Sequence, residues 1–428
     1  MFWRFIYNIF ALPSMLICFK VAGIFNKKIR EGIIGRQRVF QELERQLKLS
    51  RKIEKTAWFH FTSVGEFEQA KPLIEAIYTN VRIVSTFFSP SVAANVEKYT
   101  FLDAAVYLPF DSVRNAKRLI DMINPICLIF SKSDIWPNLV WQSAKNEIPL
   151  ILIAGTLHPG SKSLSWYCRS FFKSIHKYMT LYCAISESDA DRFQRLCTSN
   201  QEIVVSGDTR FDQVYKRANS VEPDTNFFPG QSTLIRPVFI AGSTYRDDEK
   251  VILDTYQILR KEDHELIPHL IVVPHEPTPE RIAEITNDLD RRELSYTCYT
   301  KLSEDVDLNG FDVLIIDTVG ILAKLYQLAS IVFVGGSFHG KVHNVMEPAA
   351  MAKPVIFGPT IQNAYEASLL VDREAAKRVE TPEQMAEVIT EWINSDVKRF
   401  SAGIIGKQVI EENIGAVERT LAYLQDYV

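Results

Sequence analysis

The stretch IVFVGGSFHGKVHNVME, residues 331–347, is typical of a buried strand that runs through a glycine-rich loop into a helix. Gly335 and Gly336 allow the backbone to approach a phosphate, and the N–H groups that begin the helix carry partial positive charge. Glu347, one turn into the helix, could accept two hydrogen bonds from a ribose diol. The stretch therefore predicts a nucleotide-binding unit of an α/β fold.

A purely structural interpretation of this stretch is also open. Asn344 as the N-cap and Glu347 at the third helical position would form a capping box, and Pro348 is tolerated in a first turn. The glycine loop and the helix start occur together with a later turn at Gly358-Pro359. This combination favours the nucleotide site.

The alternation of β-branched runs and amphipathic stretches continues on both sides of this unit, and it predicts parallel sheets built from βαβ units. The expected strands lie at 58–62, 82–86, 126–130, 150–154, 182–185, 237–241, 270–273, 313–316, 331–334 and 354–357. A chain of 428 residues is also longer than a single core normally supports, so two domains are expected.

The polar, proline-containing range 206–235 separates the two sets of strands and is predicted to be a linker. Residues 39–205 are then a first Rossmann-like domain. Residues 236–428 are a second one, whose last helix could pack back on the first. Two such domains are expected to face each other across a cleft that is lined by the carboxyl ends of their strands.

The N-terminal segment, residues 1–38, differs from the rest of the chain. Fifteen residues without a charge separate Arg4 from Lys20, fewer than the ~20 needed to span a bilayer. In positions 20–40, six basic residues stand against one acidic residue, Glu31. We expect a monotopic helix on an anionic membrane surface. The alternatives are a signal peptide, for which a cleavage site is lacking, and an ordinary buried helix.

Composition limits the classes of partner. A net charge of −4 argues against nucleic acid. The six cysteines are scattered without a C-x-x-C pair, as buried thiols in a reducing compartment would be. No metal-binding motif occurs, so neither a metal nor another cofactor is expected.

Three loops of the first domain carry candidate catalytic residues. Glu66 follows the strand at 58–62, where a general base should stand, although Ser63-x-x-Glu66 is also a capping box. Asp134 follows the strand at 126–130 and could be catalytic or an N-cap. Arg210 could bind a phosphate or carboxylate as a bidentate donor, or form a salt bridge at a hinge.

Two loops of the second domain lie on the same predicted rim as the glycine loop. Pro274-His275 ends the strand at 270–273, and His275 could contact a phosphate or base or be an ordinary loop histidine. Asp317-Thr318-Val319-Gly320 offers backbone N–H groups or is a plain turn before a helix.

Five segments in this order resemble the 3-deoxy-D-manno-octulosonic acid (Kdo) transferases, which are GT-B glycosyltransferases that attach Kdo to the lipid A precursor. They are the N-terminal segment, SVGE at 63–66, DIWPN at 134–138, GDTRFD at 207–212, and GGS through HNVMEPAA at 335–350. The resemblance implies an inverting reaction with CMP-Kdo as donor and no metal, on the cytoplasmic face of the inner membrane of a Gram-negative bacterium.

By position, the resemblance assigns the general base to Glu66 and stabilisation of the transition state to Asp134 and Arg210. It places the CMP contacts at Pro274, His275, Val319, Gly320, Ile321, Asn344, Val345, Met346 and Glu347.

The sequence departs from the family pattern at four places. Asp134 stands for a glutamate, Arg210 for a lysine and His275 for an arginine, and Lys341-Val342 interrupts a usual Gly-Gly before His343. Two other functions are therefore considered, a nucleotide-sugar epimerase of GT-B-like fold and a non-catalytic protein that binds a nucleotide sugar.

Overall fold

The structure is a computed structural model that describes residues 2–198, 200–220, 227–228, 234–261, 267–303, 306–362 and 364–428. The chain forms two compact units. Unit 1 comprises Met1–Asp212 and Ile414–Val428, and unit 2 comprises Gln213–Asn413. The chain therefore passes from one unit to the other twice. Part of the predicted linker, including Pro223, Pro229 and Gly230, lies outside the described residues.

Unit 1 is built on a parallel seven-stranded sheet in the order β3-β2-β1-β4-β5-β6-β7. Its strands are β1 (Thr56–Phe61), β2 (Arg82–Phe87), β3 (Ala104–Tyr107), β4 (Cys127–Ser131), β5 (Leu150–Gly155), β6 (Leu181–Ala184) and β7 (Glu202–Val205). Its central helices are α5 (Val64–Ile77), α6 (Pro90–Glu97), α7 (Val113–Ile123), α8 (Pro137–Lys145), α9 (Arg169–His176) and α10 (Glu187–Gln194).

Apolar side chains on both faces of this sheet are buried. One core cluster joins β-strand residues such as Trp58 and Phe130 to α7, α8, α9 and α10. The other joins Phe59 and Phe61 to α5 and α6. Because helices cover both faces, the central strands are continuous apolar runs, as expected for parallel sheets.

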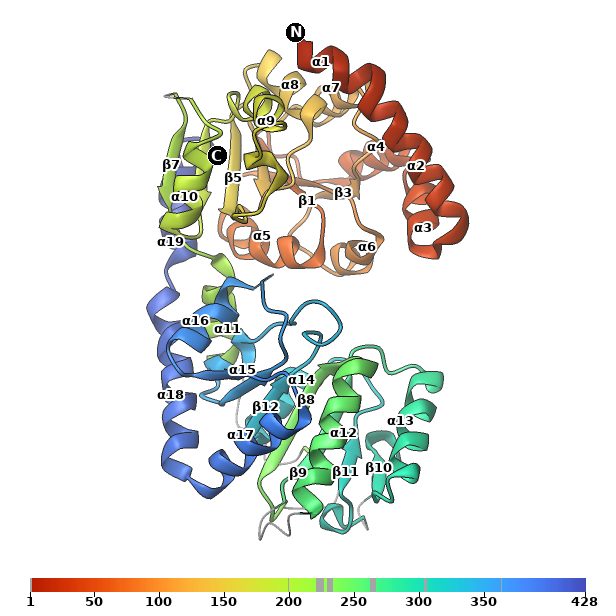
Figure 1. The fold of residues 1–428 in the computed structure, drawn as a ribbon. Helices are drawn as coiled ribbons and strands as arrows, with labels where there is room; N and C mark the ends of the chain where they lie inside the picture. Colours follow the sequence, from red (N-terminus) through yellow and green to blue (C-terminus); the bar gives the residue numbers. More distant parts are fainter. Residues whose placement is uncertain are drawn as a thin grey trace. The chain divides into compact units, whose positions relative to one another are not determined.

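The N-terminal segment is helical throughout, as α1 (Phe2–Ile6), the π-helix η1 (Tyr7–Ala11), α2 (Leu12–Phe25), α3 (Lys27–Gly35) and α4 (Val39–Leu49). In Figure 1, α1 and α2 form the red helix on the outside of unit 1. Tyr7 and Leu12 are buried in the unit's core, whereas Phe10, Ile17 and Ile24 are 59%, 64% and 67% exposed. One side of the helix is therefore packed and the other is apolar and open.

The predicted linker contains a helix, which is a correction to the prediction. Helix α11 (Thr209–Ser220) occupies its first half, and Asp212, within that helix, ends the first part of unit 1. This helix was not predicted from the sequence because its composition is polar and charged. The C-terminal helix α19 (Ala416–Leu424) belongs to unit 1: the carboxylate of Asp212 accepts hydrogen bonds from Gly415 N and Ala416 N, at 2.7 and 3.0 Å.

Unit 2 is built on a second parallel sheet, in the order β10-β11-β9-β8-β12-β13-β14. Its strands are β8 (Val238–Thr244), β9 (His269–Pro274), β10 (Tyr296–Cys298), β11 (Val313–Ile315), β12 (Ile331–Val334), β13 (Val355–Phe357) and β14 (Ala376–Arg378). Its helices are α12 (Arg246–Lys261), α13 (Pro279–Arg291), α14 (Leu322–Leu325), α15 (Met346–Ala350), α16 (Tyr365–Asp372), α17 (Pro382–Asn394) and α18 (Asp396–Asn413).

All ten predicted strands are confirmed. Nine agree within one or two residues at each end, and the strand predicted at 237–241 continues three residues further, to Thr244. The arrangement as two parallel-sheet α/β units is also confirmed. The four strands that the prediction missed are β3, β7, β10 and β14. Each of them is an edge strand of its sheet. Edge strands have one open side, and here they are short and less apolar than the central strands.

Candidate active site

Glu66 lies in the first turn of α5, directly after β1. Its Oε2 accepts hydrogen bonds from Thr62 N (2.5 Å) and Ser63 N (3.2 Å), so the predicted capping box is present. Burial raises the pKa of the Glu66 carboxyl, and the charge of Asp134 raises it further. The two N–H groups and His60 act in the opposite direction. Capping therefore fixes a half-buried carboxyl in place without excluding a role in proton transfer.

Asp134 lies in the turn between β4 and α8, next to Glu66. Its Oδ2 accepts a hydrogen bond from Trp136 Nε1 at 3.2 Å and lies 3.8 Å from His60 Nε2. The alternative that Asp134 is an N-cap is wrong, because Trp136 occupies the N-cap position of α8. The carboxylate is about one third exposed and is held by neighbouring rings.

His60 is a site residue that the sequence analysis missed. It is 1% exposed, and its Nδ1 forms a 3.0 Å hydrogen bond with Thr86 Oγ1. Among the described residues, its buried Nε2 has no hydrogen-bond partner. The imidazole interacts electrostatically with Glu66 and Asp111 and pairs with Asp134. The available signal was a histidine near the end of the apolar run WFHF, where a strand should meet the functional edge.

Arg210 lies at the start of α11, where its guanidinium is paired with Asp208. Its Nε and Nη2 donate to Asp208 Oδ2 at 3.0 and 2.6 Å. Asp208 is buried and also accepts from Gln69 Nε2 at 3.2 Å, and Arg210 counteracts the effect of burial to hold the pKa of Asp208 below its usual value. The salt-bridge alternative for Arg210 is thus present in the structure, with a partner that the sequence analysis did not name.

In unit 2, the glycine loop that follows β12 folds tightly on itself. A Cβ on Gly335 would lie 2.4 Å from Ser243 O, and Gly336 has a φ of +94°. The N–H groups of Lys341 and His343 donate to the carbonyls of Gly336 and Gly335, at 2.9 and 3.1 Å. The Lys341-Val342 insertion is accommodated with Lys341 exposed and Val342 buried. These two glycines are thus required by contacts within the protein.

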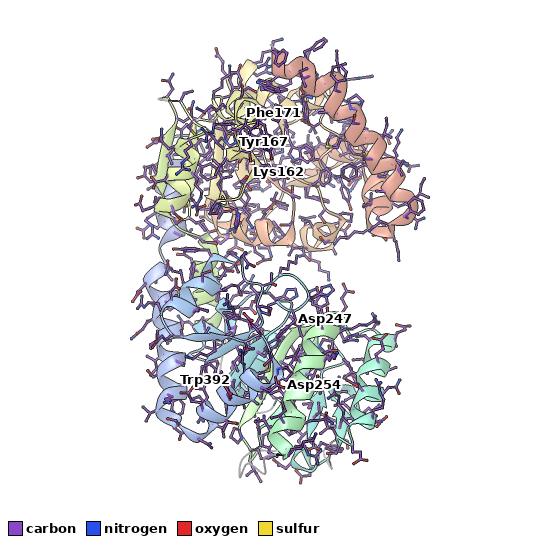
Figure 2. The ribbon with its side chains drawn as sticks, viewed as in Figure 1. Lys162, Tyr167, Phe171, Asp247, Asp254 and Trp392 are labelled. Atoms are coloured by element: carbon purple, nitrogen blue, oxygen red, sulfur yellow. The ribbon has the colours of Figure 1, made fainter. Side chains whose placement is uncertain are left out.

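Asp248, in the first turn of α12, holds the glycine loop in place. Its carboxylate accepts hydrogen bonds from Gly336 N (2.7 Å), Tyr245 N (2.9 Å) and Phe338 N (3.3 Å). Burial raises the pKa of Asp248, and these N–H groups oppose that shift. Its neighbour Asp247, labelled in Figure 2, is exposed and pairs instead with His339 at 3.1 Å. Asp248 was not predicted, since its contact to the loop spans 88 residues.

Asn344 and Glu347 do not form the capping box that was considered for them. Val345 is the N-cap of α15, and Asn344 Oδ1 accepts from Met346 N at 3.1 Å. Because the helix begins at Met346, Glu347 is its second residue and not the third residue that a capping box requires. Glu347 lies close enough to Tyr326 for its charge to add to the effect of burial in raising that tyrosine's pKa.

His275 takes part in a stack of rings at the ends of β8, β9 and β12. Its ring lies 4.5 Å from His343 and 5.0 Å from Tyr245, and Tyr245 stacks on His339 at 4.6 Å. Burial, together with the neighbouring His275 and Lys341, lowers the pKa of His343 to about 4. Burial also lowers the pKa of His275. Both rings are therefore uncharged near neutral pH.

Val319, Gly320 and Ile321 follow β11 at the same edge of the sheet. Val319 is 73% exposed, and Gly320 has a φ of +90° with no heavy atom within 4 Å of the position of a Cβ. This turn is open, in contrast to the glycine loop. The predicted nucleotide-contacting residues thus follow three strands of one parallel sheet, β9, β11 and β12, and share its carboxyl edge.

Comparisons with known proteins point to one family. A family model described as 3-Deoxy-D-manno-octulosonic-acid transferase (kdotransferase) matches residues 36–213. A 3-deoxy-D-manno-octulosonic acid transferase of Haemophilus influenzae is 26% identical over 440 residues, which cover 100% of this chain and 99% of that protein. One of Rickettsia bellii is 27% identical over 377 residues, 87% of this chain and 86% of that protein. These matches support the predicted resemblance to the Kdo transferases.

The resemblance to these transferases supports the predicted glycosyltransferase activity. The matched range contains Glu66, Asp134 and Arg210, together with the unpredicted His60 and Asp208. A solved UDP-GlcNAc 2-epimerase from Neisseria meningitidis bound to UDP-GlcNAc is 12% identical, with a TM-score of 0.59, and the match covers 87% of this chain and 100% of that one. This likeness concerns the fold alone, which is the predicted GT-B type.

Within the described part of the chain, no group of three or more histidine, cysteine, aspartate or glutamate residues is arranged to hold a metal ion. The roles of the individual site residues, and a reaction without a metal, stay predictions.

Proposed function

We propose that this protein moves Kdo from CMP-Kdo to a hydroxyl group of a lipid A precursor, with inversion at the anomeric carbon, in lipopolysaccharide biosynthesis. One observation carries the proposal: within the range matched to the family, Glu66 is a half-buried carboxyl with a raised pKa beside Asp134 and His60. A general base needs such a pKa, closer to the working pH than that of an exposed glutamate.

The proposed reaction is a single displacement. The acceptor oxygen forms a bond to the anomeric carbon of Kdo, and the bond from that carbon to the phosphate oxygen of CMP breaks. CMP leaves with the bonding electron pair, and the hydroxyl proton passes to the carboxylate of Glu66. Thr62 N and Ser63 N hold that carboxylate by hydrogen bonds to Oε2, so its orientation is set before the acceptor arrives.

In this proposal Asp134 positions the acceptor, and Arg210 stabilises the charge that develops on the leaving group. Two nitrogens of the Arg210 guanidinium donate to Asp208, which holds the side chain in one position. The Arg210 side chain therefore loses less conformational entropy when it binds the leaving group. The substitution of arginine for the usual lysine therefore keeps the positive charge in a more rigid form.

The donor is proposed to bind at the carboxyl edge of the unit 2 sheet. The open turn at Val319, Gly320 and Ile321 offers unhindered backbone, and the stacked rings of His275 and His343 offer flat surfaces and ring nitrogens. The proposed donor site also includes Pro274, Asn344, Val345, Met346 and Glu347. Glu347 is the candidate to accept hydrogen bonds from the ribose diol.

The protein is further proposed to act at the cytoplasmic face of the inner membrane, with an anionic membrane surface as partner. Among the described residues, one helix, Phe2–Phe25, is long and apolar enough to cross a membrane. Its packed side supports a position on the surface instead. Trp3 Nε1 donates to Ser170 Oγ at 3.1 Å, next to Phe171, which is labelled in Figure 2. Asn8 and Asn138 exchange amide hydrogen bonds of 3.1 and 2.8 Å.

The test is a transfer assay with the full-length protein, CMP-Kdo and a tetraacylated lipid A precursor, analysed by mass spectrometry. The expected product is the precursor with one or more added Kdo residues, absent with heat-inactivated protein. Conversion of a nucleotide sugar without any acceptor would favour the epimerase alternative. An unchanged lipid and an intact donor would overturn the proposal.

A further inference from the structure

Four partly exposed aromatic rings form a continuous row across unit 1. Phe19 of α2 contacts Phe110 and Phe88, with ring centroids 5.9 and 5.6 Å apart. Phe88 in turn stacks on Trp136 at 4.9 Å. We call these four residues the aromatic row. Phe110, Phe88 and Trp136 follow β3, β2 and β4, so the row runs along the same carboxyl edge that carries Glu66.

The aromatic row joins two features of different chemistry. Phe19, which lies between Phe110 and Phe88 in the row, belongs to the helix whose outer side chains, such as Ile17 and Ile24, are exposed and apolar. At one end of the row, Trp136 Nε1 donates to the Asp134 carboxylate at 3.2 Å. The row therefore leads from an apolar surface to the polar site within a single unit.

Anchoring the helix does not account for the row. Tyr7 and Leu12 already bury the helix in the core, whereas all four rings of the row stay partly open to solvent. Contiguous apolar surface that is left open on a folded domain usually marks a binding site.

A buried cation lies under the row. Arg36 is 8% exposed, and its guanidinium lies 4.1 Å from the ring centre of Phe88. It donates to the carbonyl oxygens of Gly32, Phe88 and Leu108, at 2.7, 2.6 and 2.9 Å. Among the described residues Arg36 has no ion pair with a carboxylate, and burial lowers its pKa to about 10. An unbalanced positive charge beside an apolar path suits an acidic lipid.

We propose that the aromatic row is the acceptor site, in which an acyl chain of an acidic glycolipid lies on Phe19, Phe110 and Phe88 and its sugar headgroup ends at Trp136 and Asp134. This inference rests on the proposed function, and it assigns the residues that select an acylated acceptor. The sugar hydroxyl is then delivered to the edge where Glu66 stands, while the chain continues onto the apolar side of α2.

The test compares a tetraacylated lipid A precursor with the same headgroup after complete deacylation, both in detergent solution. Wild-type protein is expected to prefer the acylated acceptor in kcat/KM. Phe88→Ser and Phe110→Ser should each reduce this preference about tenfold, mainly through KM of the acylated acceptor, with KM for CMP-Kdo unchanged. Phe88→Leu should restore most of the preference.

Phe101→Ser is the matched control, because Phe101 is a partly exposed ring of unit 1 that contacts the rings of Tyr78 and Tyr99, outside the row. It should keep the wild-type preference, and circular dichroism should show all variants folded. Wild-type preference in both row variants would overturn the inference.

A wild-type protein that transfers no Kdo would instead count against the proposed function. Calorimetric titration with the acylated lipid then decides the inference independently: equal binding by wild type, Phe88→Ser and Phe110→Ser would overturn it.

Discussion

The hydroxyl of Tyr7 donates a 2.9 Å hydrogen bond to Oδ2 of Asp111, and this buried contact joins the N-terminal helix to the core of unit 1. The same carboxylate accepts from Asn138 N and Leu139 N, at 2.9 and 3.1 Å. These two residues begin α8, directly after Trp136. The helix that we assign to the membrane surface is thus tied to the segment that carries Asp134.

The first prediction concerns the pH dependence of stability. Burial raises the pKa of Asp111 to about 6 from 3.8, so the folded protein holds this proton more tightly than the unfolded chain. Its contribution to stability is therefore complete below about pH 4 and is lost as the pH rises through 6. The loss amounts to roughly 3 kcal/mol. Asp111→Asn should abolish this slope when urea unfolding is followed from pH 4 to 7. An identical slope in wild type and variant would contradict the assignment.

The second prediction concerns the general base. Glu66→Gln should keep the fold, because a glutamine at the third helical position can still accept the N–H bonds of the cap. It should lower kcat for Kdo transfer by about 10²–10⁴, the usual contribution of a positioned base. Affinity for CMP-Kdo, measured by calorimetry, should not change. Near-normal transfer by a folded Glu66→Gln protein would show that another group takes the proton.

The third prediction concerns the glycine loop. Asp248→Asn replaces a carboxylate that accepts three N–H groups with an amide whose NH₂ cannot accept any. We expect unit 2 to lose about 1–3 kcal/mol of stability and the affinity for CMP-Kdo to fall about tenfold. Asp247→Asn is the matched control, because Asp247 is exposed and pairs with the exposed His339. Equal affinity for CMP-Kdo in both variants would contradict the proposal that Asp248 positions the glycine loop for donor binding.

The fourth prediction concerns membrane binding. Simultaneous replacement of Phe10, Ile17 and Ile24 by serine removes exposed apolar area but leaves Tyr7 and Leu12 in the core. Binding to anionic phospholipid vesicles should weaken about hundredfold, because each side chain contributes roughly 1 kcal/mol.

The control for that experiment is the triple serine variant of Val397, Phe400 and Ile404, which are 80%, 59% and 54% exposed on α18 of unit 2. Its sedimentation with vesicles should match that of wild type. Similar release of both variants would mean that general surface apolarity, and not the N-terminal helix, drives binding.

The sequence predicted the elements whose burial in the fold leaves a local pattern of apolar residues. Central strands such as β1 and β4 are buried on both faces, so their apolar runs identify them, whereas β10 and β14 are short edge strands without such a run. The position of Glu66 followed from the end of a strand. Asp248 and Asp208 could not be predicted, because their roles depend on contacts with Gly336 and Gln69, which lie 88 and 139 residues away.

The return of Ile414–Val428 to unit 1 affects how the protein is made. Leu424 of α19 is completely buried against the same face of the sheet as α5, and Asp212 holds the start of this helix. A ribosome that synthesises the chain in order therefore releases all of unit 2 before unit 1 can close. The unit with Glu66 is completed last, so C-terminal truncation damages the half of the molecule where translation began.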